Sequence, residues 1–451
     1  MGRIFVFEQA GPTAGMWQQR SVPANLAPQY HTALTNVMLK QGMTHIRPGV
    51  RKLNGVLFGA DGNRTMHGMT TWKDSVDGDQ IIAAAGTHLQ RMPVIGGDPE
   101  DLTTAYPSGF AARTGYRTQF VHFNGCLYIV NGLDANVKYN GTTLTKMGLS
   151  APTTLAAPTK SGGGLTMVRD YRARLVSSAA NGSQESEPTA VMSVTYTEQQ
   201  GAFVAPSVPS NDPQVDRWNL EARPQSGALY YRVNPTPVTL ATTIGDNLSD
   251  LLLQAGTASA NLLNNSLPPG PFHVLCEHQG RLVGAIGNRL YYSDQGLDAA
   301  GLYFKPDAWP PGNVINFGEN GGNYITGLVS FFTSLVIGQD FGAWTIEKSL
   351  ADESAREIFP LTVAPNSTGV GFADITNVAV APGRMLFSGK DRIYQIIQNS
   401  NALRSTIAVV PVTDSVSALY RQIDYDQGGA SVYDNDNKQW VFFGRGRTRR
   451  V

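Results

Sequence analysis

The sequence predicts an all-β protein, a β-propeller of about six blades with one inserted domain. Three observations support this prediction. A hairpin-like motif recurs along the chain at a nearly constant interval. The composition, with 48 Gly and 26 Pro in 451 residues, is that of a turn-rich β protein. One long gap in the repeat marks the position of the insertion.

The clearest copy of the motif is E-H-Q-G-R-L-V-G-A-I-G-N-R-L-Y-Y-S-D, residues 277–294. A turn at Gln279-Gly280 precedes an apolar run at 282–286. A second turn at Gly287-Asn288 precedes Leu-Tyr-Tyr at 290–292. Turn dipeptides between apolar and aromatic segments are typical of β-hairpins.

Looser copies of the motif occur throughout the chain. The six copies begin at residues 78, 124, 279, 333, 383 and 437, so the successive intervals are 46, 155, 54, 50 and 54 residues. Repeats of about 40 to 50 residues are typical of propeller blades, each a four-stranded sheet. One such sheet cannot cover its own apolar faces, whereas stacked sheets bury both faces and leave only short edges exposed.

The 155-residue interval predicts a guest domain at 151–270, which divides the chain into 1–150, 151–270 and 271–451. A Pro/Gly-rich segment, 151–164, is predicted as a linker. Strand-like segments broken by turns then predict a fibronectin- or immunoglobulin-like β-sandwich. These segments are 166–178, 185–196, 218–224 and 228–233. A short helix is predicted ahead of Gly256.

The two ends of the chain are predicted to meet in one sheet. Propellers commonly close by pairing a terminal strand into the last blade, so Arg3–Phe7 is expected beside Trp440–Phe443. The two cysteines, Cys126 and Cys276, lie at similar points of two repeats. Cysteines on equivalent strands of different blades are too far apart for a disulfide, so both are predicted to be small buried hydrophobic residues.

The charge balance excludes a global attraction to nucleic acid or to membranes. Lys plus Arg and Asp plus Glu both number 35, and charged residues make up 16% of the chain. A weakly charged surface is typical of a subunit that packs against other subunits. The longest apolar run, 327–338, is shorter than the roughly 20 residues of a membrane span. The N-terminus lacks the pattern of a signal peptide, so synthesis in the cytoplasm without a membrane anchor is expected.

No catalytic motif stands out, and neither an enzyme activity nor a cofactor or metal is expected. Gly162-Gly163-Gly164 lacks the Lys-Ser/Thr of a phosphate-binding loop. His273 and His278 are spaced so that a strand would point them to opposite faces, which is poor zinc geometry. A cluster of carboxylates around Arg356 is predicted to be a solvated turn rather than an acid/base pair; its members are Asp352, Glu353 and Glu357.

Two basic segments are candidate contacts for nucleic acid or a partner. The C-terminal one contains Arg445, Arg447, Arg449 and Arg450. The N-terminal one contains Arg47, Arg51 and Lys52, within residues 1–60, where six basic residues and one acidic residue give a local net charge of +5. Such runs contact phosphates, but an exposed strand end or a solvated face has the same composition. The sequence leaves these alternatives open.

Several longer phrases resemble one protein family. They are T-N-V-M-L…H-I-R-P-G-V-R-K-L (35–53), G-R-L-V-G-A-I-G-N-R-L-Y-Y-S-D (280–294), A-W-P-P-G-N-V-I-N-F (308–317), I-T-G-L-V-S-F-F-T-S-L-V-I-G (325–338) and V-A-V-A-P-G-R-M-L-F-S-G-K-D-R-I-Y-Q-I (378–396). Together they resemble the tail nozzle of short-tailed bacteriophages, also called the tail hub or tail tubular protein B. The resemblance covers most of the propeller-like part, and the insertion matches only as a fibronectin-like module.

The resemblance implies a structural role in the virion tail. Such a protein forms a homo-oligomeric ring, usually of six copies, below the head-to-tail adaptor proteins. The lumen of the ring holds and then passes the phage DNA, and the outer face carries tail fibres or spikes. Two alternatives remain open. One is a carbohydrate-binding or glycan-cleaving propeller that uses Trp309, Trp344 and Trp440; the other is a tail-tip or baseplate component of a longer-tailed phage.

Overall fold

The computed structural model describes the greater part of the chain. The described residues are 3–7, 37–40, 43–46, 66–74, 78–93, 98–103, 117–178, 184–225, 227–259, 267–294, 308–318, 324–340, 342–360, 371–389, 393–399, 406–411, 423–434 and 439–446. They fall into two compact units, one formed by residues 53–315 and the other by residues 1–52 with 316–451.

The first unit contains three four-stranded antiparallel sheets in which the strands follow one another in sequence order. The first sheet consists of β4 (Met66–Asp74), β5 (Gly78–Ala85), β6 (His88–Pro93) and β7 (Glu100–Asp101). The second consists of β8 (Gln119–Phe123), β9 (Cys126–Val130), β10 (Val137–Tyr139) and β11 (Leu144–Lys146). The third consists of β20 (Val274–His278), β21 (Arg281–Ile286), β22 (Arg289–Tyr292) and β23 (Val314–Asn316).

The second unit contains two further sheets of the same kind and one that joins both ends of the chain. The fourth sheet consists of β24 (Ile325–Phe331), β25 (Ser334–Gln339), β26 (Ala343–Glu347) and β27 (Glu357–Pro360). The fifth consists of β28 (Val378–Ala381), β29 (Arg384–Ser388), β30 (Ile393–Asn399) and β31 (Thr406–Pro411), preceded by the 3₁₀ turn η3 (Ile375–Asn377). The strands β2 (Val37–Lys40) and β3 (Met43–Ile46) form a separate two-stranded sheet.

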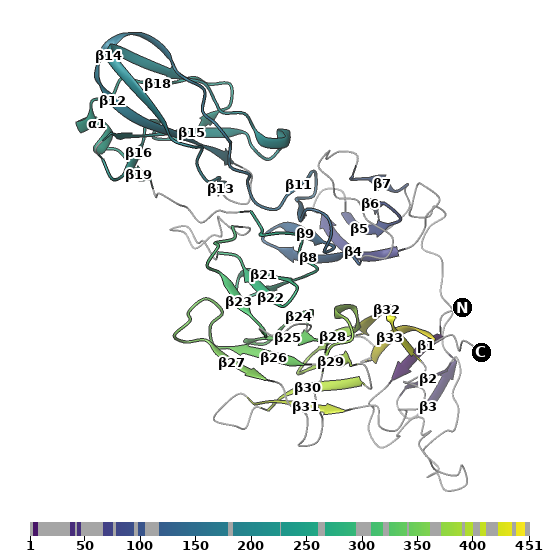
Figure 1. Ribbon diagram of the computed structural model, residues 1–451. Helices are drawn as coiled ribbons and strands as arrows, with labels where there is room; N and C mark the ends of the chain where they lie inside the picture. The colour runs from purple at the N-terminus through teal and green to yellow at the C-terminus, as the bar shows by residue number, and fades with distance from the viewer. Residues whose placement is uncertain are drawn as a thin grey trace, which may run out of the picture. The chain divides into compact units, whose positions relative to one another are not determined.

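The sixth sheet confirms the predicted pairing of the chain ends. β33 (Gln439–Gly446) lies between β32 (Ile423–Asp434) and β1 (Arg3–Phe7), with Phe7 opposite Trp440. The chain is thus an all-β protein of the β-propeller class, as predicted, and Figure 1 shows the successive sheets. The sequence predicted a propeller of six or so blades. Among the described residues, five of these sheets have four strands each, and the sixth has three strands.

The six copies of the sequence motif occupy equivalent positions. In each sheet the motif is the connection between the first and second strands together with the second strand, as in β8–β9, β20–β21 and β24–β25. The turn residues Asn124-Gly125 and Gln279-Gly280 all have positive φ, between 46° and 70°. Both turns therefore need residues that tolerate the left-handed region, which is why Asn and Gly recur there.

Strands in the middle of these sheets are buried on both faces. All five residues of β9 are buried. Leu127 and Ile129 pack into one core with residues of β5 and β6, while Cys126, Tyr128 and Val130 pack into another core with residues of β20 and β21. Since alternate side chains of a strand point to opposite faces, β9 is apolar throughout because a neighbouring sheet covers each face.

Phe372, which precedes the fifth sheet in the chain, packs closely against the backbone of the fourth sheet. A Cβ placed on Gly338 in β25 would lie 2.1 Å from the ring of Phe372. The Phe372 ring also packs on Phe387 of β29, with ring centroids 4.4 Å apart. Only glycine at 338 leaves room for this ring, so the repeated glycine after the apolar run of the motif has a packing role here.

The insertion is one eight-stranded sheet (Figure 1). Its strands are β12 (Thr159–Ser177), β13 (Gln184–Glu185), β14 (Met192–Phe203), β15 (Arg217–Pro224), β16 (Tyr230–Arg232), β17 (Val238–Thr239), β18 (Ile244–Asp246) and β19 (Ala258–Ser259). A 3₁₀ turn, η2 (Pro209–Asn211), precedes β15, and the predicted short helix is α1 (Asp250–Gln254), capped by Ser249. The predicted fibronectin- or immunoglobulin-like sandwich is not confirmed, because hydrogen bonds join all these strands into a single sheet.

Two smaller predictions are corrected. The segment 159–164, predicted as part of a linker, belongs to β12, where Gly162 and Leu165 flank a register shift that accommodates the glycines. Cys126 and Cys276 are free, as predicted, but they are not equivalent. Cys126 is buried at the start of a second strand, and the half-buried Cys276 lies in a first strand.

One buried residue, Asn136, contacts both ends of the insertion through its side chain and its backbone. Asn136 donates from Nδ2 to the carbonyl of Gly270 at 2.8 Å and accepts from the amide of Phe272 at 2.9 Å. The backbone carbonyl of Asn136 accepts from the backbone amide of Met147, at 2.9 Å. Met147 precedes the insertion and Gly270 follows it, so Asn136 holds both ends beside the second sheet.

Candidate functional site

The densest group of charged side chains in the described part of the chain lies on one face of the inserted sheet. β12 and β15 pair antiparallel, with Arg172 opposite Glu221 and Arg174 opposite Asn219. On the other face of the same strands, Tyr171, Leu175, Trp218 and Leu220 enter the apolar core of the insertion. The alternation R-D-Y-R-A-R in β12 is therefore that of a strand with one apolar and one charged face.

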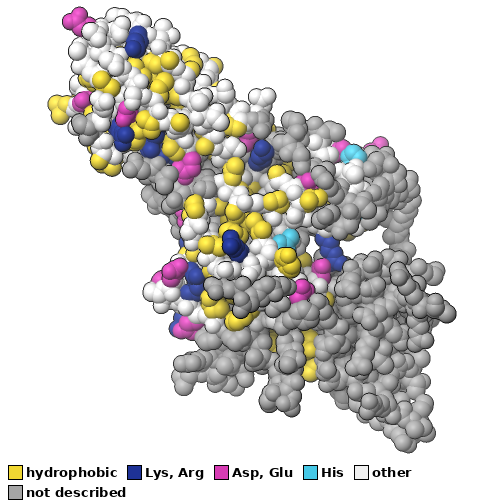
Figure 2. Space-filling model, viewed as in Figure 1, with side chains coloured by type: hydrophobic (Ala, Val, Ile, Leu, Met, Phe, Trp, Pro, Cys, Tyr) yellow, Lys and Arg dark blue, Asp and Glu magenta, His cyan; other side chains and the backbone are white. Residues whose placement is uncertain are grey.

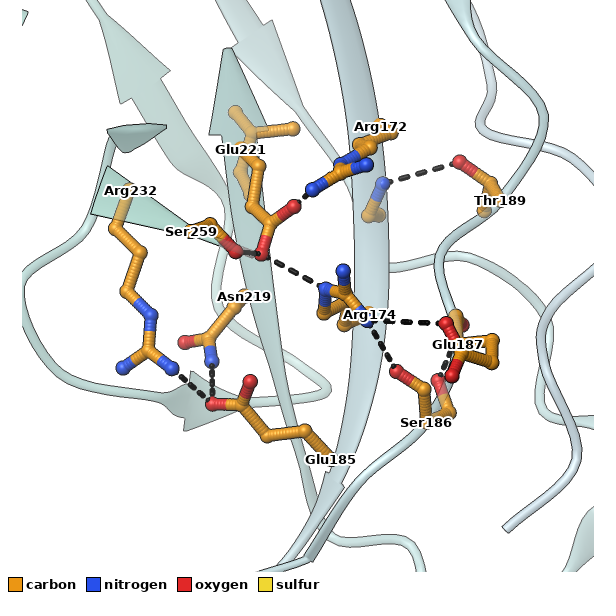
Figure 3. A network of polar contacts seen from close by, with 12 residues as sticks. Arg172, Arg174, Glu185, Ser186, Glu187, Thr189, Asn219, Glu221, Arg232 and Ser259 are labelled. Carbon is orange, nitrogen blue, oxygen red and sulfur yellow. Dashed lines mark hydrogen bonds and ion pairs between the residues drawn. The ribbon is translucent and has the colours of Figure 1, made fainter. Parts of the chain in front are cut away.

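Glu221 is the centre of this charge network (Figure 3). Its Oε2 accepts from Nε of Arg172 at 2.5 Å, and its Oε1 accepts from Nε of Arg174 at 2.8 Å. The hydroxyl of Ser259 in β19 also donates to Oε1. The side chains of Glu221 and Arg174 are fully buried and that of Arg172 nearly so. Glu221 thus joins β12, β15 and β19 through charge-assisted hydrogen bonds.

The segment after β12 covers the other side of Arg174. The Arg174 Nη1 donates to the carbonyl of Ser186 at 2.9 Å and lies 3.7 Å from the carboxylate of Glu187. Next to it, Glu185 in β13 accepts from Nδ2 of Asn219 at 2.8 Å and from Arg232 in β16. Figure 3 shows that these carboxylates reach the network from the strand and loop that follow β12.

Tyr230 of β16 packs between two arginines at the edge of the network. The guanidinium of Arg172 lies 3.9 Å from the centre of the Tyr230 ring, and that of Arg223 lies 4.8 Å from it. Arg223 also lies 3.1 Å from the carboxylate of Asp170. Burial raises the pKa of the Tyr230 hydroxyl, against the lowering effect of the two cations. The phenol therefore stays neutral and acts as an aromatic surface for the guanidinium groups.

A second buried ion pair lies near the other face. Arg169 is fully buried, and its guanidinium is 2.8 Å from Asp246 of β18 and 2.5 Å from Asp250 of α1. The hydroxyl of Tyr171 donates to the same carboxylate of Asp246. Burial and the nearby Asp246 carboxylate raise the pKa of Tyr171, which keeps it a donor.

Two of the three arginines of β12, Arg169 and Arg172, respond differently to burial. Burial lowers the pKa of Arg172, and the nearby cation of Arg174 lowers it further, against the raising effect of Glu221. The pKa of Arg169 is instead raised: burial opposes its charge, but Asp246 and Asp250 together outweigh that cost. A guanidinium remains protonated in both settings, so the difference measures how well each charge is compensated.

The chemistry of the network favours mechanical stability over catalysis. Both oxygens of Glu221 hold guanidinium groups, and the Ser259 hydroxyl donates to the same carboxylate. A carboxylate in this setting is a poor base, and a hydroxyl directed at it is not activated as a nucleophile. Among the described residues, no group of three or more His, Cys, Asp or Glu could hold a metal ion.

The predicted basic contacts remain predictions. Arg445 is in β33, where its backbone pairs with Asp424 of β32. The other six residues lie outside the described ranges: Arg47, Arg51, Lys52, Arg447, Arg449 and Arg450. The structure therefore gives no side-chain arrangement for either basic segment.

The carboxylate cluster around Arg356 is a turn, as predicted. Asp352 accepts from the amide and the hydroxyl of Ser354, and these bonds hold its pKa below the usual range. Glu353 is largely exposed, 4.0 Å from Arg356, and Glu357 pairs with Lys348. Each carboxylate thus has its own partner in the turn.

Sequence reasoning missed the Glu221 network although part of its signal was visible. Arg172 and Arg174 alternate with apolar residues in a segment predicted to be a strand. Their shared partner, Glu221, lies 47 to 49 residues further along the chain, and Ser259, which donates to Glu221, lies another 38 residues beyond it. A charged face that alternates with an apolar one fits a solvated strand equally well, so only the pairing of strands identifies the network.

Comparisons with known proteins leave the chain without a family. No family model matches it, and no curated protein matches it significantly. No helix among the described residues is both long enough and apolar enough to cross a membrane.

Solved structures that resemble the chain do so weakly. The extracellular domain of a hybrid two component system from B. thetaiotaomicron has a TM-score of 0.31 at 10% identity, covering 88% of this chain and 40% of its own. The Neurospora crassa Pan2 WD40 domain has a TM-score of 0.26 at 10% identity, covering 85% and 90%. Citrobacter koseri AztD has a TM-score of 0.24 at 13% identity, covering 76% and 89%. This chain spans less than half the length of the first of these proteins, and similarities at this level assign no function.

Proposed function

We propose that this chain is a structural subunit of the tail nozzle of a short-tailed bacteriophage. In this proposal several copies form a ring, usually six, that attaches to head-to-tail adaptor proteins, retains and passes the phage DNA, and carries fibres or spikes. The chain would reside in the virion tail after synthesis in the host cytoplasm and would act without enzymatic chemistry or cofactor.

The observation that carries the proposal is the position, in the fold, of the sequence segments that resemble the tail nozzle family. The phrase at 280–294 covers β21 and β22, that at 325–338 covers β24 and β25, and that at 378–396 runs from β28 into β30. In each case the phrase includes the second strand of a sheet, β21, β25 or β29, whose side chains are largely buried. Similarity spread over equivalent positions supports a shared architecture more than one isolated motif does.

The distribution of charge supports the same role. The most buried charges of the insertion are used in ion pairs within the sheet. On the face shown in Figure 2, basic and acidic side chains lie in small mixed groups over the described residues. A conduit for DNA should avoid strong phosphate binding, because each neutralised phosphate adds affinity and slows passage.

The carbohydrate-active alternative loses two of its candidate aromatics. Trp309 and Trp440 are each only 3% exposed, and Trp309 packs on Phe272 with ring centroids 4.7 Å apart. Trp344 is half-buried and donates from Nε1 to Gln339. Sugar binding by aromatic stacking needs an exposed ring face. The burial of these tryptophans therefore fits a role in core packing better than a role in sugar binding.

Assembly distinguishes the candidate functions. The purified chain is mixed with portal and adaptor proteins of a short-tailed phage, and the mass of the products is measured by native mass spectrometry. The proposal predicts a discrete complex with several copies of this chain in addition to the adaptor ring. A chain that stays unbound there but binds on a glycan array would contradict the nozzle and support the carbohydrate-active propeller.

A further inference from the structure

The chain passes from the propeller sheets into the insertion within a few residues. Met147 belongs to the apolar core of the second and third sheets, whereas Leu149 belongs to the core of the insertion. Gly148, between them, is buried and has φ of +79°. Glycine adopts this region of φ without steric cost, so Gly148 lets the chain turn sharply from one core into the other.

A side chain of the insertion binds the backbone before and after this turn. Gln214 lies in the segment between η2 and β15. Its Nε2 donates to the carbonyl of Gly148 at 2.8 Å and to that of Lys146, the last residue of β11, at 3.2 Å. Gln214 therefore connects the insertion directly to the fourth strand of the second sheet.

A buried carboxylate orients the Gln214 side chain. Asp212 accepts from Nε2 of Gln214 at 2.8 Å and from the backbone amide of Gln214 at 3.2 Å. The nitrogen thus faces three acceptors, which identifies it as the donor end of the amide. The Oε1 of Gln214 is buried and has no hydrogen-bond partner. The side chain acts as a donor only, and the bonds of Nε2 must outweigh the cost of that unpaired oxygen.

The segment that carries Gln214 moves with the insertion. Val215, the next residue, packs in the core of the insertion together with Leu149. The carbonyl of Lys146, in contrast, belongs to a strand of the second sheet. A displacement of the insertion on this sheet therefore breaks the bond from Gln214 to Lys146.

We propose that Gln214 is a latch that fixes the insertion against the second sheet, with Gly148 as the joint that it locks. With the latch in place the insertion and the second sheet move as one body. Without it, backbone rotation at Gly148 lets the insertion change its direction, because glycine has the widest choice of backbone angles. The contact lies within a single chain, so its test is independent of the proposed nozzle.

An isosteric substitution tests the latch. Gln214→Glu keeps the shape of the side chain but replaces the donor by an acceptor, which then faces a carboxylate and two carbonyl groups. Gln214→Ala removes the donor without adding a charge. Gln200→Glu is the matched control, since Gln200 is in β14 of the same insertion and its Nε2 makes one exposed bond, to Ser161 at 3.3 Å.

Hydrogen exchange of the isolated chain at neutral pH is the first measurement. We expect backbone amides in 144–150 and 212–216 to exchange at least about tenfold faster in both Gln214 variants, as loss of a hydrogen bond to a charged group predicts. Amides of β9 and β15, inside the two cores, should exchange as in the wild type. Exchange at the junction like that of the wild type in both variants overturns the latch. An equal increase throughout both cores also overturns it, because Gln214 would then support the whole fold.

Electron–electron distance measurement shows whether the insertion changes its position. Spin labels are attached at Thr142→Cys, in the second sheet, and Thr197→Cys, in β14, in a chain whose native cysteines are alanine. We expect one narrow distance distribution with Gln214 and with Gln200→Glu, and a broad one with Gln214→Glu. A broad distribution with Gln214 in place, or a narrow and unchanged one in Gln214→Glu, would contradict the proposal.

Discussion

The sheets of the propeller and the sheet of the insertion bury their second faces in different ways. β9 places apolar side chains on both faces, because each face packs against a neighbouring sheet of the first unit. β12 and β15 place apolar side chains on one face and a network around Arg172, Arg174 and Glu221 on the other. β9, residues 169–177 of β12 and residues 218–222 of β15 are all buried, although β9 is apolar and the other two segments carry several charges.

The difference teaches what burial requires of each surface. An apolar face needs only a complementary apolar surface, and it is insensitive to which partner supplies it. A charged face needs each charge compensated by a particular partner at hydrogen-bond distance. The propeller sheets should therefore tolerate exchange among apolar residues, whereas the inserted sheet should fail when a single partner is removed.

The largest effect is expected from removing the central carboxylate charge. Glu221→Gln removes the carboxylate charge that Arg172 and Arg174 share, and breaking such a buried network costs about 3–5 kcal/mol. Urea unfolding followed by protease protection of the insertion measures this loss. Lys348→Gln is the control, since it removes an exposed ion pair with Glu357 and should change stability little. Equal effects of the two variants would contradict the network.

Truncation of the propeller core should cost nearly as much. Leu127→Ala leaves a cavity in the core shared by the first two sheets, with an expected loss of about 2–5 kcal/mol. Leu127→Met keeps the volume and should cost under about 1.5 kcal/mol. Urea denaturation at constant pH compares the two. A loss for Met as large as that for Ala would show that this core needs a specific shape.

The propeller should also lose stability in mild acid through His278. Burial lowers the pKa of this side chain to about 4, so the unfolded chain binds a proton between pH 6.5 and 4 that the folded chain does not. The contribution is present above pH 6.5 and is lost as the pH falls to 4, by up to about 3 kcal/mol. His278→Gln should flatten the dependence of unfolding free energy on pH in this window. An unchanged pH profile would show that His278 does not cause it.

The smallest effect is expected when the whole charged centre is replaced. A chain with Arg172→Met, Arg174→Met and Glu221→Leu exchanges ion pairs for apolar contacts, and such exchanges are often neutral or stabilising. Its unfolding free energy is expected within about 1 kcal/mol of the wild type, far from the loss in Glu221→Gln. If the triple variant is as unstable as Glu221→Gln, the network does more than balance its own charges.

The sequence predicted the propeller well because its signal is local and repeated. Each of the six motifs pairs a turn with the strand that follows it, so one short segment predicts one hairpin. The pairing of Arg3–Phe7 with β33 followed from closure of the last sheet rather than from any local pattern. The insertion carried no repeat, and its strands fit a two-sheet sandwich as well as the single sheet that they form.

The candidate site was less predictable because it depends on distant pairing. The basic runs at 445–450 and 47–52 stood out because their charges are adjacent in sequence. Arg174 and Glu221 meet only because β12 and β15 pair in one particular register. A shift of one residue would turn Glu221 into the apolar core, and no local pattern fixes that register.

The most direct test of the account is imaging of the assembled particle. The chain is fused to a small electron-dense or fluorescent label at its N-terminus and incorporated into short-tailed phage particles, which are then examined by electron cryo-microscopy. The account predicts labelled copies arranged in a ring at the distal end of the tail, below the adaptor proteins. Label absent from the tail, or present as single copies elsewhere on the particle, would contradict the proposed role.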